Sequence, residues 1–128
     1  SYLVSQLGNY HTLAAEIHST ARAAPETRVL MLWEPRTLYC QPACTGDDNL
    51  NTWQKALDSE GSGEAVLALW EQQGYTHVLI SHRGAEFLLG EEIDRIPRLT
   101  RYDELLALIP GRLHPVRQYD DYGLYELR

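Results

Sequence analysis

The sequence predicts a small three-layer α/β domain, a Rossmann-like sandwich whose mixed sheet combines a parallel core pair with a C-terminal antiparallel hairpin. Two short and nearly continuous apolar runs, 28–33 and 76–81, are typical of strands that are covered on both faces. Helical segments lie between these runs, so a right-handed crossover makes the two strands parallel. The tail after the last helical segment changes to the pattern of antiparallel strands.

The first half of the chain is expected to contain three helices around the first strand. Apolar residues at helical spacing predict an amphipathic helix near 9–23, which Pro25 ends. A short helix is expected at 52–59, beyond a polar turn. Ser62 then caps a further helix, which continues until Gly74 stops it.

The segment after the second strand is expected to return to helix. Residues 83–89 predict one or two helical turns. Thr100 with Asp103 resembles a capping box, so the last helix is expected to begin there and to stop at the Pro-Gly pair 110–111.

The tail is expected to form a β-hairpin. Residues 113–119 and 123–127 are strand-like runs joined by the turn 120–122. Pro115 cannot donate a hydrogen bond to a ladder, so its strand is expected at a sheet edge or with a bulge.

Length and charge limit the classes of function. The 128 residues suit a single domain, 1–128, and the net charge of −7 argues against nucleic-acid binding because phosphates would be repelled. No apolar run approaches the roughly 20 residues that span a bilayer, so the chain is expected to be soluble. It starts at Ser1 without a Met, as a processed protein or an excised fragment would. A fragment of a larger protein is the favoured interpretation, because Arg128 ends directly on a predicted strand.

The common catalytic and metal-binding motifs are absent from the sequence. The Gly-Ser-Gly at 61–63 lacks the preceding strand of a phosphate fingerprint and is interpreted as helix punctuation. His11 and His18 lie about 10 Å apart on one helix face, too far for one metal. His77 and His82 are expected along one strand, on opposite faces. No cofactor and no metal are therefore expected.

Four side chains after the first strand form a candidate binding corner. Trp33 and Tyr39 offer flat rings with polar rims, while Glu34 and Arg36 offer directed hydrogen bonds, which together suit a sugar or peptide. The alternative is structural, with Glu34 and Arg36 paired to each other or to helix ends and Trp33 in the core.

The acidic pair that follows is a weaker candidate. Asp47 and Asp48 could bind a cation. Two adjacent acids more often lie in a solvated loop or cap the following helix, so both interpretations stay open.

The only two cysteines, Cys40 and Cys44, allow three interpretations. A local disulfide would indicate an oxidising compartment and would stiffen the turn. Two free thiols would suit a cytosolic protein. A thiolate nucleophile would need a histidine partner, and no such partner is placed by the sequence. The disulfide is the favoured interpretation.

Several of these segments together resemble a known family. The pattern comprises Leu-Gly-Asn-Tyr at 7–10, the string Leu-Trp-Glu-Pro-Arg-x-x-Tyr-Cys at 32–40, Trp53, 76–79 and the tail 122–127. It is similar to the C-terminal soluble region of bacterial multi-pass glycosyltransferases of the dolichyl-phosphate-mannose protein mannosyltransferase type. Only the Trp-Glu-Pro-Arg-x-x-Tyr-Cys string is specific.

The resemblance implies a location and a partner. In such enzymes a membrane-embedded part uses polyprenyl-phosphate sugars and carries the catalytic acids. The soluble tail lies outside the cytoplasm on the cell membrane, which agrees with a disulfide between Cys40 and Cys44. No catalytic residue is therefore expected in this chain. The family's Pro near Asp47 is replaced here by Thr45-Gly46.

Two functions from different classes follow. The chain is expected to be a non-catalytic accessory domain that packs on the membrane part of the same polypeptide or positions an acceptor or glycan substrate. The alternative is a stand-alone small α/β enzyme or small-ligand binder that uses Cys40 or Glu34 in the turn 33–44. A pure interaction module without a ligand is a third, weaker idea.

Overall fold

The computed structural model describes the backbone of residues 2–37, 39–91 and 95–128, and the side chains of 8–37, 39–86 and 101–128. Its described strands form one five-stranded sheet in the order β2-β1-β3-β5-β4. Their bounds are Val29–Leu32 for β1, Cys44–Thr45 for β2, His77–Ser81 for β3, Leu113–Gln118 for β4 and Tyr122–Leu127 for β5. β1 pairs in parallel with β2 and β3, whereas β5 is antiparallel to both β3 and β4. The predicted mixed α/β sheet is confirmed.

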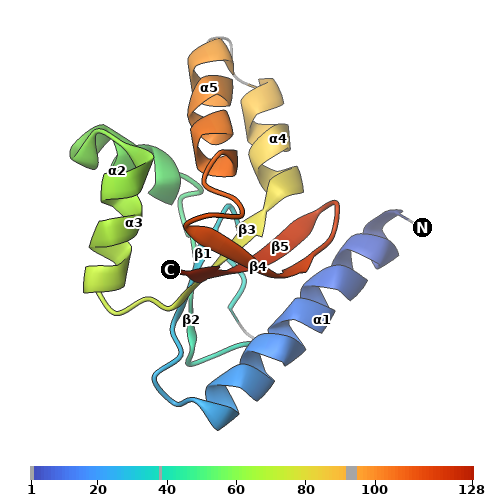
Figure 1. Ribbon diagram of the computed structural model, residues 1–128. Coiled ribbons are helices and arrows are strands. Elements are labelled where there is room, and N and C mark those ends of the chain that lie inside the picture. The colour runs from blue at the N-terminus through green and yellow to red at the C-terminus, as the bar shows by residue number, and fades with distance from the viewer. Residues whose placement is uncertain (1, 38, 92–94) are drawn as a thin grey trace.

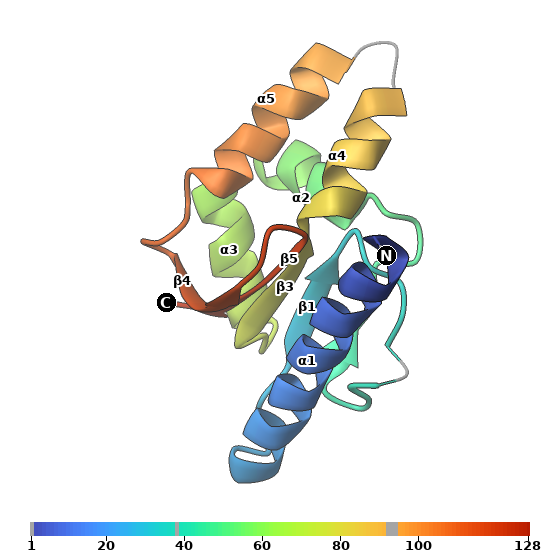
Figure 2. The ribbon, with the colours of Figure 1, turned by 90° about the vertical axis from the view of Figure 1, so that its right-hand side faces the viewer.

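Helices cover both faces of this sheet (Figures 1 and 2). The described helices are α1 Tyr2–Ala23, α2 Thr52–Glu60, α3 Gly63–Gln72, α4 His82–Glu91 and α5 Arg95–Leu106. α1 runs along one face, and α2 with α3 lies on the other. α4 continues directly from the end of β3, and α4 and α5 stand together as a helical hairpin beyond that end of the sheet. No helix in the described part of the chain is long and apolar enough to cross a membrane.

The two faces of the central strands build two cores. Successive strand residues point to opposite faces, so a buried strand supplies both cores at once. On β1, Leu30 and Leu32 pack on the side of α2 and α3. Val29 and Met31 pack on the side of α1. This double burial explains why 28–33 is an almost unbroken apolar run.

The predicted punctuation of the middle helices is confirmed. The Ser62 hydroxyl accepts a hydrogen bond from the Ala65 amide at 3.2 Å, which caps α3. Gly61 and Gly74 follow α2 and α3 with φ of 88° and 96°, a left-handed conformation that glycine adopts without strain. The Gly-Ser-Gly is therefore helix punctuation.

The predicted boundaries of three helices, α1, α4 and α5, are wrong. α1 begins at Tyr2 rather than near residue 9, and α4 spans ten residues rather than one or two turns. Thr100 lies inside α5, which begins at Arg95. Pro97 is in the first turn of α5, where a proline is tolerated because its missing amide has no partner there anyway. The position of Pro97 is therefore compatible with a helix that begins at Arg95, ahead of the expected capping box.

The C-terminal hairpin is confirmed together with its irregularity. β4 lies at the edge of the sheet, and its register with β5 shifts between Pro115 and Arg117. Both the edge position and the bulge follow from the missing amide of Pro115. The short edge strand β2 at the other side, Cys44–Thr45, was not predicted, because two residues carry no periodic pattern.

Candidate functional site

The chain turns sharply where β1 ends, and Asp47 holds this turn. Trp33 has a φ of 60°, which a non-glycine residue rarely adopts. Its amide donates to Asp47 Oδ2 at 2.8 Å, and the Glu34 carbonyl accepts from the Asp47 amide at 3.0 Å. The two segments thus fix each other, and the left-handed turn directs the next side chains toward α1.

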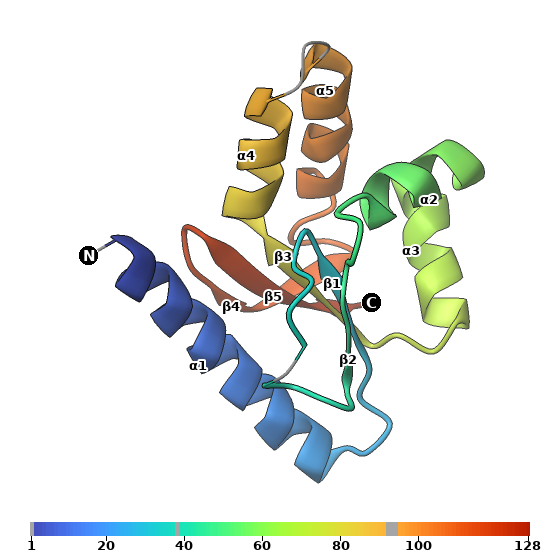
Figure 3. The same ribbon diagram turned by 180° about the vertical axis from the view of Figure 1, so that it is seen from behind.

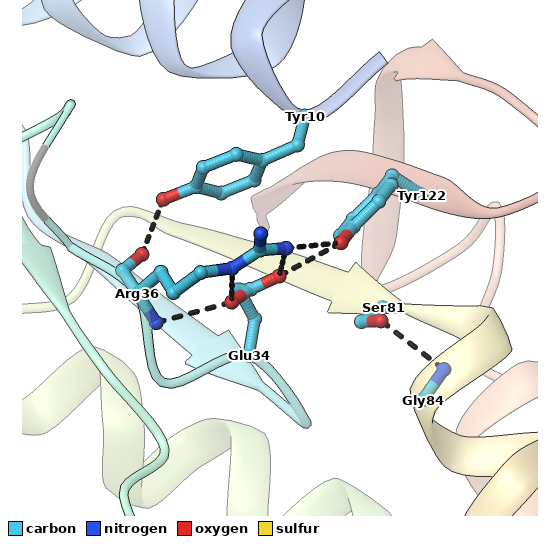
Figure 4. A network of polar contacts seen from close by, with 6 residues as sticks. All are labelled: Tyr10, Glu34, Arg36, Ser81, Gly84 and Tyr122. Atoms are coloured by element: carbon cyan, nitrogen blue, oxygen red, sulfur yellow. Dashed lines mark hydrogen bonds and ion pairs between the residues drawn. The ribbon is translucent and has the colours of Figure 1, made fainter. Parts of the chain in front are cut away.

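Glu34 is the centre of a buried polar network (Figure 4). Its side chain is only 3% exposed, yet it forms a two-point ion pair with Arg36, at 2.9 Å from both Nε and Nη2. The Arg36 amide donates to Glu34 Oε2 at 3.0 Å, and the Tyr122 hydroxyl donates to Oε1 at 2.8 Å. Burial acts to raise the pKa of Glu34, but the hydrogen bonds from Arg36 and Tyr122 outweigh it and the pKa lies below its ordinary value.

Tyr10 of α1 completes this network from above. Its hydroxyl donates to the Arg36 carbonyl, and its ring lies 4.8 Å from the Arg36 guanidinium carbon. Burial raises the pKa of Tyr10 to about 12, so the hydroxyl keeps its proton. The predicted pairing of Glu34 with Arg36 is confirmed. Tyr10 and Tyr122 were missed, because nothing in the sequence brings residues so far apart to one carboxylate.

Three exposed side chains among the described residues of this region, His11, Arg36 and Tyr39, are here named the aromatic corner. Tyr39 is 54% exposed, and its ring centroid lies 4.5 Å from that of His11 in an edge-to-face arrangement. The Arg36 side chain is 48% exposed. The Tyr39 ring and the Arg36 guanidinium both contact the ring of Tyr10. An exposed aromatic ring and an exposed guanidinium are groups that can contact a sugar or a peptide.

Trp33 does not belong to the aromatic corner. Its ring packs edge-to-face against Tyr102 of α5 at 5.5 Å and joins the core on the side of α2 and α3. Tyr39 packs against α1 through His11 and Tyr10. The structure thus divides the predicted binding set: Trp33 and Glu34 are packed inward, whereas Arg36 and Tyr39 remain accessible.

Asp47 caps α2, as one of the two predicted interpretations proposed. Its side chain is buried, and Oδ1 accepts from the amides of Asn51 and Thr52 at 3.2 Å and from the Thr52 hydroxyl at 2.7 Å. Asp48 is exposed and, together with Lys55, lines a hollow of about 330 Å³. Among the residues that the structure describes, no three His, Cys, Asp or Glu side chains are grouped to hold a metal ion.

Cys40 and Cys44 form a disulfide, with their Cα atoms 5.7 Å apart. The favoured interpretation is confirmed, and the alternatives with free thiols or a thiolate nucleophile are wrong for this structure, which leaves neither cysteine free. Cys40 is buried against the α1 side of the sheet. The bridge therefore closes the turn beside the aromatic corner.

A second buried network, not predicted, surrounds His82. His82 is only 8% exposed, and its Nδ1 and Nε2 lie 2.6 and 2.9 Å from the hydroxyls of Tyr102 and Tyr125. Its amide donates to the Asp121 carbonyl at 2.9 Å. Burial lowers the pKa of His82, so the neutral ring is favoured. The expectation that His77 and His82 share a strand is wrong, since His82 is the first residue of α4.

The junction between β3 and α4 is capped by Ser81. Its hydroxyl accepts from the Gly84 amide at 3.2 Å, as Figure 4 shows. A serine between a buried strand and a helix is the sequence signal that could have located this boundary. The hydroxyl is therefore used to start a helix.

The ionisable groups at this end of the sheet satisfy one another. Glu34 is bonded to Arg36 and Tyr122, Asp47 to backbone amides, and His82 to two tyrosines. Among the described residues, these contacts form no nucleophile with an oriented base. Comparison with known proteins gave no match: no family model, no curated protein and no solved structure matches the chain.

Proposed function

We propose that this chain is a non-catalytic accessory domain of a membrane glycosyltransferase that uses polyprenyl-phosphate sugars, and that it lies outside the cytoplasm. One observation carries the non-catalytic role: the buried acid after β1 is held by Arg36 and Tyr122 and kept ionised. A carboxylate that must act as an acid or base needs a pKa near the working pH and a free lone pair. Glu34 meets neither condition, because its pKa is lowered and both of its side-chain oxygens already accept hydrogen bonds from Arg36 or Tyr122.

The segment that carries the family resemblance supports the same role. In the string at 32–40, Trp33 makes the left-handed turn, Glu34 and Arg36 form the ion pair, and Cys40 enters the disulfide. Each has a structural reason to be present. The string thus acts as the signature of a locked turn, which suits an accessory domain better than an active site.

The disulfide supports the location. Disulfides persist in oxidising compartments and are rare in the cytosol, where thiols are kept reduced. Cys40 and Cys44 are bridged in this structure. In our proposal the partner is the membrane-embedded part of the same polypeptide.

The aromatic corner is the surface we assign to the acceptor or glycan. Tyr39 and Arg36 are accessible there, while the groups beneath them are bound to each other. A sugar ring can stack on the tyrosine and accept hydrogen bonds from the guanidinium. The stand-alone enzyme is disfavoured, because Cys40 carries no thiol and Glu34 is paired.

Two measurements on the parent polypeptide test this proposal. An alkaline phosphatase reporter fused after Arg128 is expected to be active, since that enzyme works only outside the cytoplasm. Fluorescence from a green fluorescent protein fused at the same position would refute the location, because it would place that position in the cytoplasm. Tyr39→Ala is expected to raise the KM for acceptor about 3- to 10-fold, the value of one aromatic contact. Val116→Ala is the control, because Val116 is also exposed, but on β4. Equal KM values for both variants would remove the corner from substrate binding.

A further inference from the structure

A separate hollow lies between the C-terminal end of α1 and the disulfide turn. These two segments, far apart in sequence, run side by side in two views of the molecule (Figures 2 and 3). The hollow has a volume of about 310 Å³ and lies away from the aromatic corner, whose residues do not line it. That volume is at the lower end of the range of small-molecule sites, roughly 300–1,000 Å³. We name it the disulfide pocket.

The walls of the disulfide pocket are mostly apolar. α1 contributes Ala21, the following turn contributes Pro25, and the disulfide turn contributes Cys40, Pro42 and Ala43. Prolines and a disulfide restrict the backbone on both sides. A pocket with restricted walls loses little conformational entropy when a ligand enters.

The ionisable side chains that line the pocket are both basic. Arg22 and His18 are one turn apart on the same face of α1, and both are exposed. This is unusual in a chain whose acids outnumber its lysines and arginines by 18 to 11. Glu26 lies nearby in sequence but does not line the pocket.

Arg22 is also exceptional among the described arginines. It makes no ion pair, hydrogen bond or ring contact with a described residue, whereas every other arginine with a described side chain has a partner: Arg28, Arg36, Arg83, Arg101, Arg112, Arg117 and Arg128. The carbonyl groups that end α1 carry partial negative charge, which Arg22 offsets. Its guanidinium keeps its planar fork of donors available for a carboxylate.

We propose that the disulfide pocket binds a small monocarboxylate with a short apolar body. The carboxylate pairs with the Arg22 guanidinium, with His18 beside it, and the apolar body lies against Pro42, Ala43 and the disulfide. Thr27 and Gln41 supply further polar groups in the lining. This site is independent of the accessory role and of the aromatic corner.

The test is a titration of the isotope-labelled 128-residue chain with hexanoate, followed by NMR amide shifts. Saturable shifts are expected around Arg22, Thr27 and Ala43. Arg22→Gln is expected to weaken the apparent Kd at least about ten-fold, as loss of one charged hydrogen-bonding partner does. The matched control is Lys55→Gln, which removes another exposed cation without a described partner, on α2, and is expected to change the Kd less than about two-fold.

Two further ligands and one further variant make the result decisive. Hexanamide, which lacks the charge, and inorganic phosphate, which lacks the apolar body, are each expected to bind at least about ten-fold more weakly than hexanoate. If Arg22→Gln perturbs the whole spectrum, Arg22→Lys keeps the charge at the helix end and is expected to lose affinity by removing the planar fork. Shifts that never saturate, equal affinity in Arg22→Gln and Lys55→Gln, or phosphate binding as tightly as hexanoate would each overturn the proposal.

Discussion

The ends of β1 and β3 both place an ionisable group in the protein interior, but in different charge states. Each places an ionisable side chain in the interior, Glu34 after β1 and His82 after β3. Glu34 stays charged, because a guanidinium two residues away neutralises it. His82 is favoured in its neutral form, because burial lowers its pKa and outweighs the nearby Asp121 carboxylate, which acts to raise it. A buried group is therefore kept ionised where a directly bonded counter-charge outweighs the cost of burial, and kept neutral where the cost of burial prevails.

The largest expected effect comes from removing the counter-charge. Arg36→Ala leaves Glu34 buried with Tyr122 as its remaining side-chain donor, so the free energy of unfolding should fall by about 2–3 kcal/mol, below the full loss for a buried pair because Arg36 is half-exposed. Urea unfolding measures it. Arg117→Ala is the control, since Arg117 is equally exposed at 50% but pairs with the more accessible Glu16. A loss no larger than that of the control would mean that Glu34 does not depend on its partner.

Replacing His82, the centre of the network after β3, is expected to lower the free energy of unfolding by less than Arg36→Ala does. His82→Phe keeps an aromatic ring at this position but leaves the Tyr102 hydroxyl without its hydrogen-bond partner. The free energy of unfolding should fall by about 2 kcal/mol. Tyr125 retains its contact with Gln118, so it is less affected. Unfolding curves of His82→Phe and Tyr125→Phe provide the comparison, and a neutral His82→Phe would show that the network adds no stability.

The two networks are expected to fail in different pH ranges. The folded pKa of His82 lies below its ordinary value of 6.5, so the stability it contributes is complete above pH 6.5 and is lost as pH falls through the folded pKa. The folded pKa of Glu34 lies below 4.5, so its contribution is lost only below that pH.

Unfolding free energy measured from pH 8 to pH 3 separates these ranges. His77 also has a lowered pKa and loses stability in the upper range, so the informative quantity is the difference between wild type and His82→Phe. That difference should shrink as pH falls below 6.5 and then level off. A difference that is constant with pH would contradict a neutral buried His82.

The smallest expected effect is the loss of one helix cap. Ser81→Ala removes the hydroxyl that accepts from the Gly84 amide at the start of α4. The expected cost is about 1 kcal/mol, the usual value of an N-cap, and Ser62→Ala at the start of α3 should cost about the same. Thermal unfolding of both variants measures it. Ser81 also forms a side-chain hydrogen bond with Tyr122, and a much larger loss at Ser81 would mean that this bond matters more than the cap.

Local patterns in the sequence predicted what local physics decides. The burial of β1 on both faces, the cap at Ser62 and the bulge at Pro115 depend on neighbouring residues, and all three are confirmed. The pairing of Glu34 with Arg36 belongs to this class, since the two are separated by one residue.

Long-range contacts were beyond such patterns. Tyr102 and Tyr125 lie 20 and 43 residues away from His82 in the sequence. The sequence around either tyrosine has no feature that indicates a common partner. The division of Trp33 from Tyr39 depends on the left-handed φ of Trp33, which no residue type encodes. Trp33 therefore packs against the core and Glu34 lies in a buried polar network, whereas Arg36 and Tyr39 remain exposed.

The central claim, an accessory domain outside the cytoplasm, is tested most directly by the redox state of its cysteines in the cells that make it. Free thiols should be alkylated at lysis, before any reduction, and the masses of the peptides that contain Cys40 and Cys44 should then be measured by mass spectrometry. Our account predicts an unlabelled, disulfide-linked pair, as the structure has it. Two alkylated cysteines in freshly lysed cells would contradict it, because a chain kept reduced in the cell would not lie in an oxidising compartment.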